Sequence, residues 1–282
     1  MTLPTIAMLK RLLPVYLLLL AACGSAPVEQ KPARVQLAEA AVLAANRSTQ
    51  VGADQDAVAY WQDALDAYAS IDHWAGQGEA RLGLAQGLAR LARRDEAHKV
   101  LAGMPEEHLY PDEVRARAAY QQALLLIDRN QPDTGEADRV ARLTSARERL
   151  GVARQLCGAA CGWSPRLDNV EAKLEIGAGH DERAAQILGG LLARNDVPSG
   201  ERAHALRLSA EVALRAGDAE AAKKSINEAL VLDRQLAEPA YLIDDYLVLR
   251  QALSADAAAQ AEVDKRLDAL CSVFAGPPCR GR

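Results

Sequence analysis

The sequence predicts an all-α protein, an α-solenoid of about twelve helices that pair into hairpins. The first observation is composition: the chain is rich in Ala, Leu, Arg and Glu, with one Phe and few β-branched residues, and these residue types favour helix. The second is that no segment shows the alternating β-branched runs, bounded by turns, that are typical of strands. The third is a helix-pair pattern that recurs along the chain.

Turn-forming residues divide residues 34–282 into the expected helices. Pro111 and Pro165 mark helix starts, because the first turn of a helix does not use the N–H that Pro lacks. Gly217 and Asp218 mark a turn at which Gly ends one helix and Asp caps the next. The expected helices span residues 34–49, 54–70, 74–92, 94–103, 112–129, 136–157, 165–178, 181–194, 199–216, 218–232, 239–253 and 255–271.

Small residues recur at equivalent positions in the second helices of five expected hairpins. The spacings between these positions are 40, 40, 47 and 38 residues. A single hairpin cannot bury its apolar face alone, so stacked neighbours share a continuous core. We therefore expect one array, with a possible subdivision in the least patterned stretch, residues 157–164. The equivalent positions are Ala57, Ala97, Ala137, Ala184 and Ala222.

The segment 203–233 carries this pattern most fully and resembles the tetratricopeptide repeat (TPR), a 34-residue helix–turn–helix unit. The resemblance implies that small residues let the paired helices cross closely and that larger apolar residues seal the next interface. The repeats here are longer and lack most aromatic positions of the family, so a generic α-solenoid is the alternative. In the preceding unit, Gly179 is expected to end a helix and Asp181 to cap the next. The residues that carry the resemblance are Leu206, Ala210, Ala213, Gly217, Asp218, Ala222, Ile226, Ala229 and Leu232.

The beginning of the chain is typical of a secretory signal. Lys10 and Arg11 precede a short apolar run, and small residues follow it. The apolar run is too short to span a bilayer, which requires about 20 apolar residues. The sequence therefore predicts a signal peptide over residues 1–22.

The end of this signal, Leu-Ala-Ala-Cys at residues 20–23, resembles the lipobox of bacterial lipoproteins. The resemblance implies that the Cys23 thiol receives a diacylglycerol, that the chain is cleaved before Cys23, and that the new amine is acylated. Several acyl chains hold a protein firmly on a bilayer. Gly24 replaces the Asp that commonly marks inner-membrane retention, which implies the outer membrane, facing the periplasm. An ordinary signal peptide with a chance cysteine is the alternative.

Three segments follow from these predictions: the signal peptide 1–22, the lipidated cysteine with a flexible tether over 23–33, and the TPR-like solenoid over 34–282. Pro27 and Pro32 prevent a continuous helix in the tether. Ten extended residues reach about 30 Å, enough to hold the folded part clear of the lipid headgroups.

Four cysteines remain after Cys23: Cys157, Cys161, Cys271 and Cys279. An even number of cysteines in an oxidising compartment indicates disulfides. Three pairings are possible, and the local pairs Cys157–Cys161 and Cys271–Cys279 are favoured. Neither pair has a nearby His or a zinc-ribbon spacing, so a metal site is not expected.

The net charge is −5, and removing Lys10 and Arg11 with the signal peptide brings the remaining chain near −7. An acidic chain is unsuited to nucleic acid, whose binders need basic patches. No P-loop, dinucleotide fingerprint, nucleophile elbow or zinc-protease motif is present. We therefore expect no catalytic residue, cofactor or metal.

By resemblance to the repeat family, the first helices line a groove in which a partner protein or peptide binds. Four of the predicted groove residues are three or four positions apart and share one helix face. The alternative is a solvated helix face held by Arg207–Glu211 and Glu211–Arg215 pairs, each worth about 0.2–0.5 kcal/mol. The predicted groove residues are Arg166, Asn169 and Lys173 on one helix and His204, Arg207, Glu211 and Arg215 on another.

These observations favour a membrane-anchored scaffold or adaptor for envelope proteins or peptides, in assembly, secretion, pilus or cell-wall machinery. One alternative is a periplasmic enzyme or small-ligand binder, which an aromatic-lined cavity would favour. Another is a structural lipoprotein that self-associates through residues 239–271. An open apolar face containing Tyr241, Tyr246 and Leu249 would favour self-association.

Overall fold

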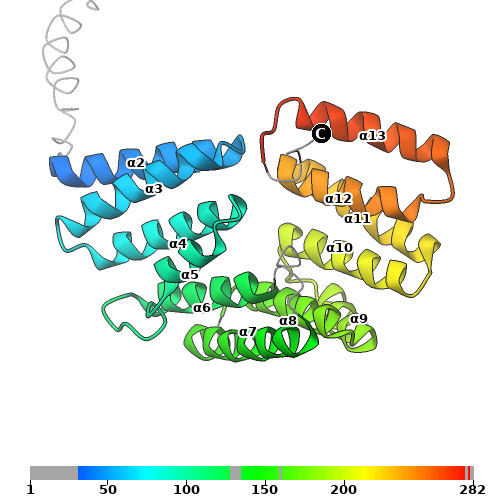
Figure 1. Ribbon diagram of the computed structural model, residues 1–282, viewed down its shortest axis with the longest axis horizontal. Helices are drawn as coiled ribbons and strands as arrows, with labels where there is room; N and C mark the ends of the chain where they lie inside the picture. Colours follow the sequence, from blue (N-terminus) through cyan, green and yellow to red (C-terminus); the bar gives the residue numbers. More distant parts are fainter. Residues whose placement is uncertain (1–30, 128–134, 159–160, 277–278, 280–282) are drawn as a thin grey trace, which may run out of the picture.

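The computed structural model describes residues 31–127, 135–158, 161–276 and 279. Within these residues it contains twelve α-helices and no strand (Figure 1), which confirms the all-α prediction. None of the described helices is both long and apolar enough to cross a membrane. The predicted signal peptide, Cys23 and all but the last three residues of the predicted tether lie outside the described residues.

The helix boundaries agree with the predicted ones within two residues, apart from the end of α11. That helix continues to Leu236, where Ala237 adopts a left-handed conformation with φ 57°. The helices are α2 (Ala33–Gln50), α3 (Asp54–Ala69), α4 (Trp74–Arg90), α5 (Arg94–Leu101), α6 (Asp112–Ile127), α7 (Glu136–Cys157), α8 (Ser164–Ala178), α9 (Asp181–Leu192), α10 (Ser199–Arg215), α11 (Ala219–Leu236), α12 (Pro239–Ala252) and α13 (Ala257–Cys271).

The turn chemistry follows the sequence in one hairpin and departs from it in another. Gly217 has φ 78°, and the Asp218 carboxylate accepts a hydrogen bond from the Ala221 N–H at the start of α11. The expected cap at Asp181 is wrong, because no side chain caps α9. The Asp181 carboxylate instead accepts a hydrogen bond from Arg215 at the end of α10.

The helices pack as consecutive hairpins. Each even-numbered helix contacts the odd-numbered helix that follows it, and α4, α6, α8, α10 and α12 also contact one another in series. Buried apolar residues form four neighbouring clusters along the array. The core is therefore distributed along the whole stack, as expected for a solenoid.

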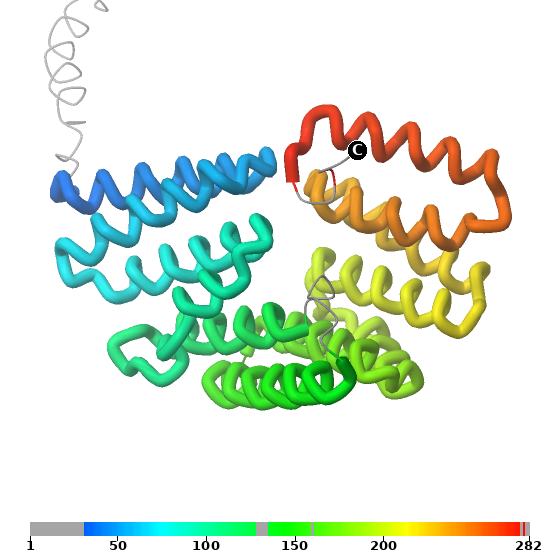
Figure 2. Tube along the Cα trace, viewed as in Figure 1, coloured from blue at the N-terminus to red at the C-terminus, as the bar shows by residue number. Residues whose placement is uncertain are grey.

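The stack curves so far that its two ends meet. Figures 1 and 2 show the chain descending from α2 to α7, ascending from α8 to α13, and returning beside the α2–α3 turn. The Ala275 N–H donates a hydrogen bond to the Val51 carbonyl at 3.4 Å. A Cβ placed on Gly52 would lie 2.5 Å from the Gly276 nitrogen, so only glycine permits this approach. We call this junction the end contact.

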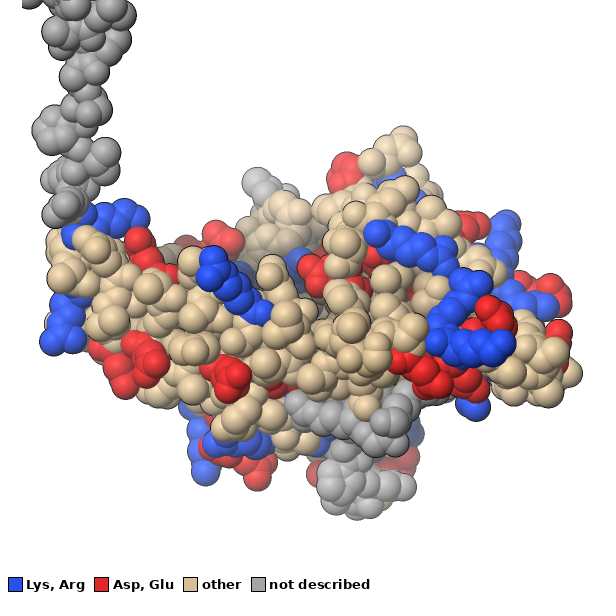
Figure 3. Space-filling view, turned by 90° about the horizontal axis from the view of Figure 1, so that it is seen from above, with Lys and Arg blue, Asp and Glu red and all other residues tan. Residues whose placement is uncertain are grey.

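Charged side chains of both signs are interspersed over the described surface that is seen from above in Figure 3. Ion pairs also join neighbouring helices, such as Arg154 with Asp168 and Arg250 with Asp264. Exposed pairs of this kind contribute about 0–1 kcal/mol each. The distribution on this face therefore points to no broad electrostatic footprint.

Candidate functional site

The predicted groove residues of α8 lie against the next first helix. The Asn169 amide is buried and donates to the Glu201 carboxylate at 3.0 Å. Arg166 donates to the same carboxylate at 2.8 Å. Lys173 is half-buried, and its charge adds to the burial that lowers the pKa of His204 well below its ordinary value. His204 is therefore neutral at pH 7.

Arg207 is buried in a charge cluster that joins α10, α11 and α12. Its Nε donates to Asp245 at 2.6 Å and its Nη2 to Asp233 at 2.8 Å. The side chains of Arg207, Asp233 and Asp245 are only 7%, 1% and 0% exposed. We call these three residues the Arg207 cluster. Its geometry makes Arg207 a core cation that links three helices.

The Arg207 cluster holds two carboxylates and one guanidinium, which leaves one negative charge in the core. Burial, opposed by Arg207, raises the pKa of Asp245 to about 7. Asp233 Oδ1 and Asp245 Oδ2 are buried and receive no hydrogen bond from another group in the described part of the chain. A single proton shared by these two oxygens satisfies both, because a protonated carboxyl becomes a donor.

The structure brings predicted groove residues of α8 and α10 together, because the charges of Arg166, Lys173 and Arg207 all add to the burial that lowers the pKa of His204. His204 lies 3.3 Å from Arg207, whereas the exposed Arg215 pairs with Asp181. Both arginines form ion pairs with aspartates from other helices, Arg207 with Asp233 and Arg215 with Asp181. A role for these residues in binding a partner stays a prediction.

The cysteine sulfurs lie at bonding distance in the two local pairs. Cys157 and Cys161 have a Cα–Cα separation of 5.1 Å, and Cys271 and Cys279 one of 5.2 Å. The second pair holds the chain segment that makes the end contact. The structure thus supports the favoured pairing over the two alternatives.

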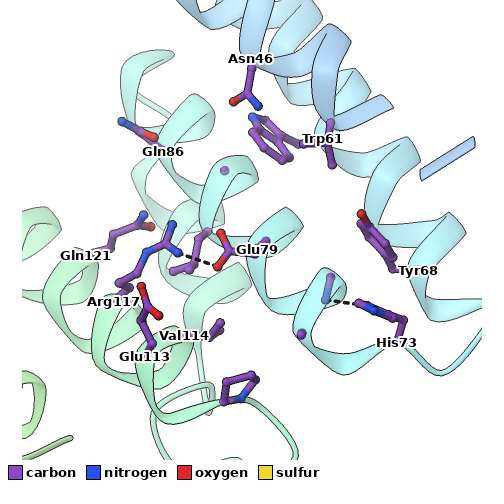
Figure 4. A pocket seen from close by; sticks show the side chains of 16 residues that line it. Asn46, Trp61, Tyr68, His73, Glu79, Gln86, Glu113, Val114, Arg117 and Gln121 are labelled. Carbon is purple, nitrogen blue, oxygen red and sulfur yellow. Dashed lines mark hydrogen bonds and ion pairs between the residues drawn. The ribbon is translucent and has the colours of Figure 1, made fainter. Parts of the chain in front are cut away.

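A cavity of about 540 Å³ opens over α4, between α2 and α3 on one side and α6 on the other (Figure 4). Trp61 and Tyr68 of α3 form an aromatic wall. Glu113, Arg117 and Gln121 of α6 form the facing polar wall. We call this space the α4 cavity. Its volume lies in the range of about 300–1,000 Å³ that is usual for small-molecule sites.

Glycines on α4 make room for the aromatic wall. A Cβ on Gly83 would lie 2.2 Å from the Trp61 ring, and a Cβ on Gly76 would lie 2.5 Å from the Tyr68 ring. Glycine inside a helix costs about 1 kcal/mol relative to alanine. The close packing of both rings on the α4 backbone offsets this cost.

Some polar groups of the α4 cavity have hydrogen-bond partners among the described residues, and others do not. Arg117 Nη1 donates to Glu79 Oε1 at 2.5 Å, and the His73 Nδ1 accepts from the Gly76 N–H at 2.9 Å. Gln121 Oε1 is buried and receives no hydrogen bond within the described residues. Glu113 is exposed and has no ion pair or hydrogen bond among them. The cavity therefore holds acceptors that a ligand could satisfy.

The α4 cavity was not predicted from the sequence, although two glycines on α4 indicate it. Gly76 and Gly83 are seven residues apart and lie on one face of α4. Two unusual glycines on one helix face indicate a close approach by another element. The aromatic side chains that approach come from the preceding hairpin.

The open apolar face that would favour self-association is absent at two of its three candidate residues. Tyr246 and Leu249 are buried, and the Tyr246 hydroxyl accepts a hydrogen bond from Arg234. Tyr241 alone of the three is exposed, at 46%. These residues therefore give self-association no support.

No group of His, Cys, Asp and Glu within the described residues has an arrangement that could hold a metal ion. No protein-family model matches the sequence, and no curated protein matches it significantly.

Proposed function

We propose that this chain is a lipid-anchored adaptor of the bacterial cell envelope, which holds a segment of another protein in the α4 cavity. The observation that carries the proposal is the cavity itself. It is open to solvent, combines an aromatic wall with unsatisfied polar groups, and lies on a rigid stack of hairpins. Such sites suit binding by shape, with a few polar groups fixing orientation.

The lipobox-like segment at residues 20–23 supports the membrane part of the proposal. Acylation of Cys23 confines the protein to a bilayer, which we propose to be the periplasmic side of the outer membrane. Confinement raises the effective concentration of the adaptor toward partners on the same surface. Replacing Cys23 by Ser should release the protein from the membrane fraction; a variant that stays in that fraction would refute the lipid anchor.

Co-purification tests the adaptor part. Full-length tagged protein is recovered from gently crosslinked envelopes, alongside two variants at exposed positions, Gln86→Trp and Gln251→Trp. Gln86 lines the α4 cavity and Gln251 lies on α12. We expect a stoichiometric partner with the parent and with Gln251→Trp, and much less with Gln86→Trp. No partner, or equal recovery with both variants, would overturn the adaptor proposal.

The aromatic wall of Trp61 and Tyr68 favours a second candidate, a binder of small molecules. Native mass spectrometry of the gently purified protein separates the two. A bound small molecule that Gln86→Trp excludes, with no protein partner, would favour the second candidate.

A further inference from the structure

We infer that the α4 cavity recognises a cationic side chain, arginine or lysine, in a basic segment of the partner. This inference rests on the proposed adaptor function and names the chemistry of the segment that it holds. Three properties of the cavity lead to it: an uncompensated carboxylate, a buried acceptor without a donor, and an aromatic wall.

The first property is charge. Glu79, Glu113 and Arg117 are the carboxylates and the guanidinium that line the cavity. Arg117 is bonded to Glu79, so Glu113 has no cation partner among the described residues. These three groups together carry one net negative charge. A ligand cation compensates it.

The second property is hydrogen bonding. Gln121 lies on the same helix as Glu113, and its Oε1 is buried without a donor from the described residues. A buried acceptor that loses water and gains no partner costs about 1–3 kcal/mol. An arginine side chain brings five N–H donors and a lysine three. Glu113 and Gln121 lie eight residues apart on α6, about 12 Å along the helix axis, so a cation at Glu113 and a neighbouring donor of the same segment can serve the two acceptors.

The third property is the wall opposite. Trp61 and Tyr68 face Glu79 and Arg117 across the cavity in Figure 4. Trp61 is buried and Tyr68 only partly so, so the Tyr68 ring is the accessible one, and attraction to an aromatic ring stabilises a cation by about 0.5–2 kcal/mol. Burial, followed by the negative field of Glu39, raises the pKa of Tyr68. The ring therefore stays uncharged, and because Glu39 is ion-paired with Lys31, the negative charge of the cavity comes from its own lining.

Size and long-range charge favour a peptide segment as the source of the cation. A volume of about 540 Å³ holds several residues rather than one side chain. Amide side chains from α2, α4 and α6, namely Asn46, Gln86 and Gln121, line it and can bond to a peptide backbone. The net charge of −5 attracts basic segments over longer distances.

Fluorescence anisotropy with the full-length protein in detergent tests the inference. The probe is a labelled, end-capped heptapeptide, Ala-Arg-Ala-Arg-Ala-Arg-Ala, and its counterpart carries neutral citrulline in place of each arginine. We expect the arginine peptide to bind at least about ten-fold more tightly, a difference of about 1.4 kcal/mol, and to weaken as salt rises. Equal affinity for the two peptides would overturn the inference.

Two variants locate the binding. Glu113→Gln should weaken binding of the arginine peptide about five-fold or more, whereas Glu228→Gln, at an exposed position on α11, should leave it unchanged. Equal effects of both variants would place the cation elsewhere. Binding of N-acetyl-arginine amide as tight as that of the heptapeptide would overturn the peptide assignment.

Failure of this inference and failure of the adaptor proposal are distinguishable. A co-purified partner that Gln86→Trp excludes, with no preference for arginine over citrulline, refutes only the cationic assignment. A Glu113-dependent arginine preference with no partner in envelopes refutes only the adaptor proposal.

Discussion

Replacing Arg207 by Met should destabilise the protein strongly, and more so at pH 8 than at pH 5. Arg207 is the cation that two buried carboxylates, Asp233 and Asp245, contact at 2.8 and 2.6 Å. Met keeps much of the aliphatic volume but leaves both carboxylates without a cation. Breaking a buried pair costs about 3–5 kcal/mol, and in a chain of this size that lowers Tm by about 6–20 °C. The loss is smaller at pH 5, because Asp245, with a pKa of about 7, is then protonated.

Thermal unfolding followed by circular dichroism measures this effect. Arg215→Met is the matched control, because Arg215 lies on the same helix but its side chain is 46% exposed in its pair with Asp181. Exposed pairs are worth about 0–1 kcal/mol, so the control should change Tm by a few degrees at most. Similar losses for the two variants at pH 8 would refute the argument that Arg207 is an essential buried cation.

Three further predictions concern carboxyl titration and the glycines. Asp245→Asn should flatten the pH dependence of stability. The folded pKa of about 7 lies above the reference value of 3.8, so the contribution of Asp245 is fully present below about pH 4 and is lost as pH rises through 7. The free energies of unfolding of parent and variant, measured by urea denaturation, should therefore diverge over this window by up to about 1.4 kcal/mol per pH unit. The same pH dependence in both proteins would contradict the assignment. Gly83→Ala should lower Tm, since its Cβ would lie 2.2 Å from an indole ring and overpacking costs about 1–3 kcal/mol. Gly189→Ala, in open space on α9, should raise stability by up to about 1 kcal/mol; a gain from both would show that the ring packing is unimportant. Gly52→Ala should increase the distance between the two ends of the stack, measured between spin labels on α2 and α13. Gly217→Ala, with a similar positive φ but nothing within 4 Å, should leave that distance unchanged, and an unchanged distance in both would argue against the end contact.

Local signals predicted the helices well because helix ends are set by short-range chemistry. The turn at Gly217 and Asp218 follows from backbone conformation and one side-chain hydrogen bond, both encoded within a few residues. The predicted end of α11 at residue 232 is too early, since Asp233 is buried within the helix. Its partner, Arg207, lies on another helix, and the helix continues past the buried pair.

The candidate site was less predictable because its parts meet only in three dimensions. The α4 cavity combines side chains from three hairpins, and the wall that Trp61 and Tyr68 form depends on glycines in the next hairpin. The expectation that Arg207 faces a groove comes from the resemblance to the repeat family, and the structure buries this residue among acids of other helices instead. Asp244 and Asp245 are adjacent acids inside an otherwise apolar segment. This pattern indicates a buried cation on a neighbouring helix.

The end contact changes how the stack should respond to stress. In an open array each unit touches only its neighbours, so terminal units fray first and unfolding can spread from either end. Joining the α2–α3 turn to the segment held by Cys271 and Cys279 gives both terminal units a second neighbour. The entropic cost of bringing Val51 and Ala275 together grows only slowly with the length of chain between them. Loss of the end contact therefore lets both terminal units fray at once. We expect unfolding of the whole stack to become less cooperative when this contact is broken.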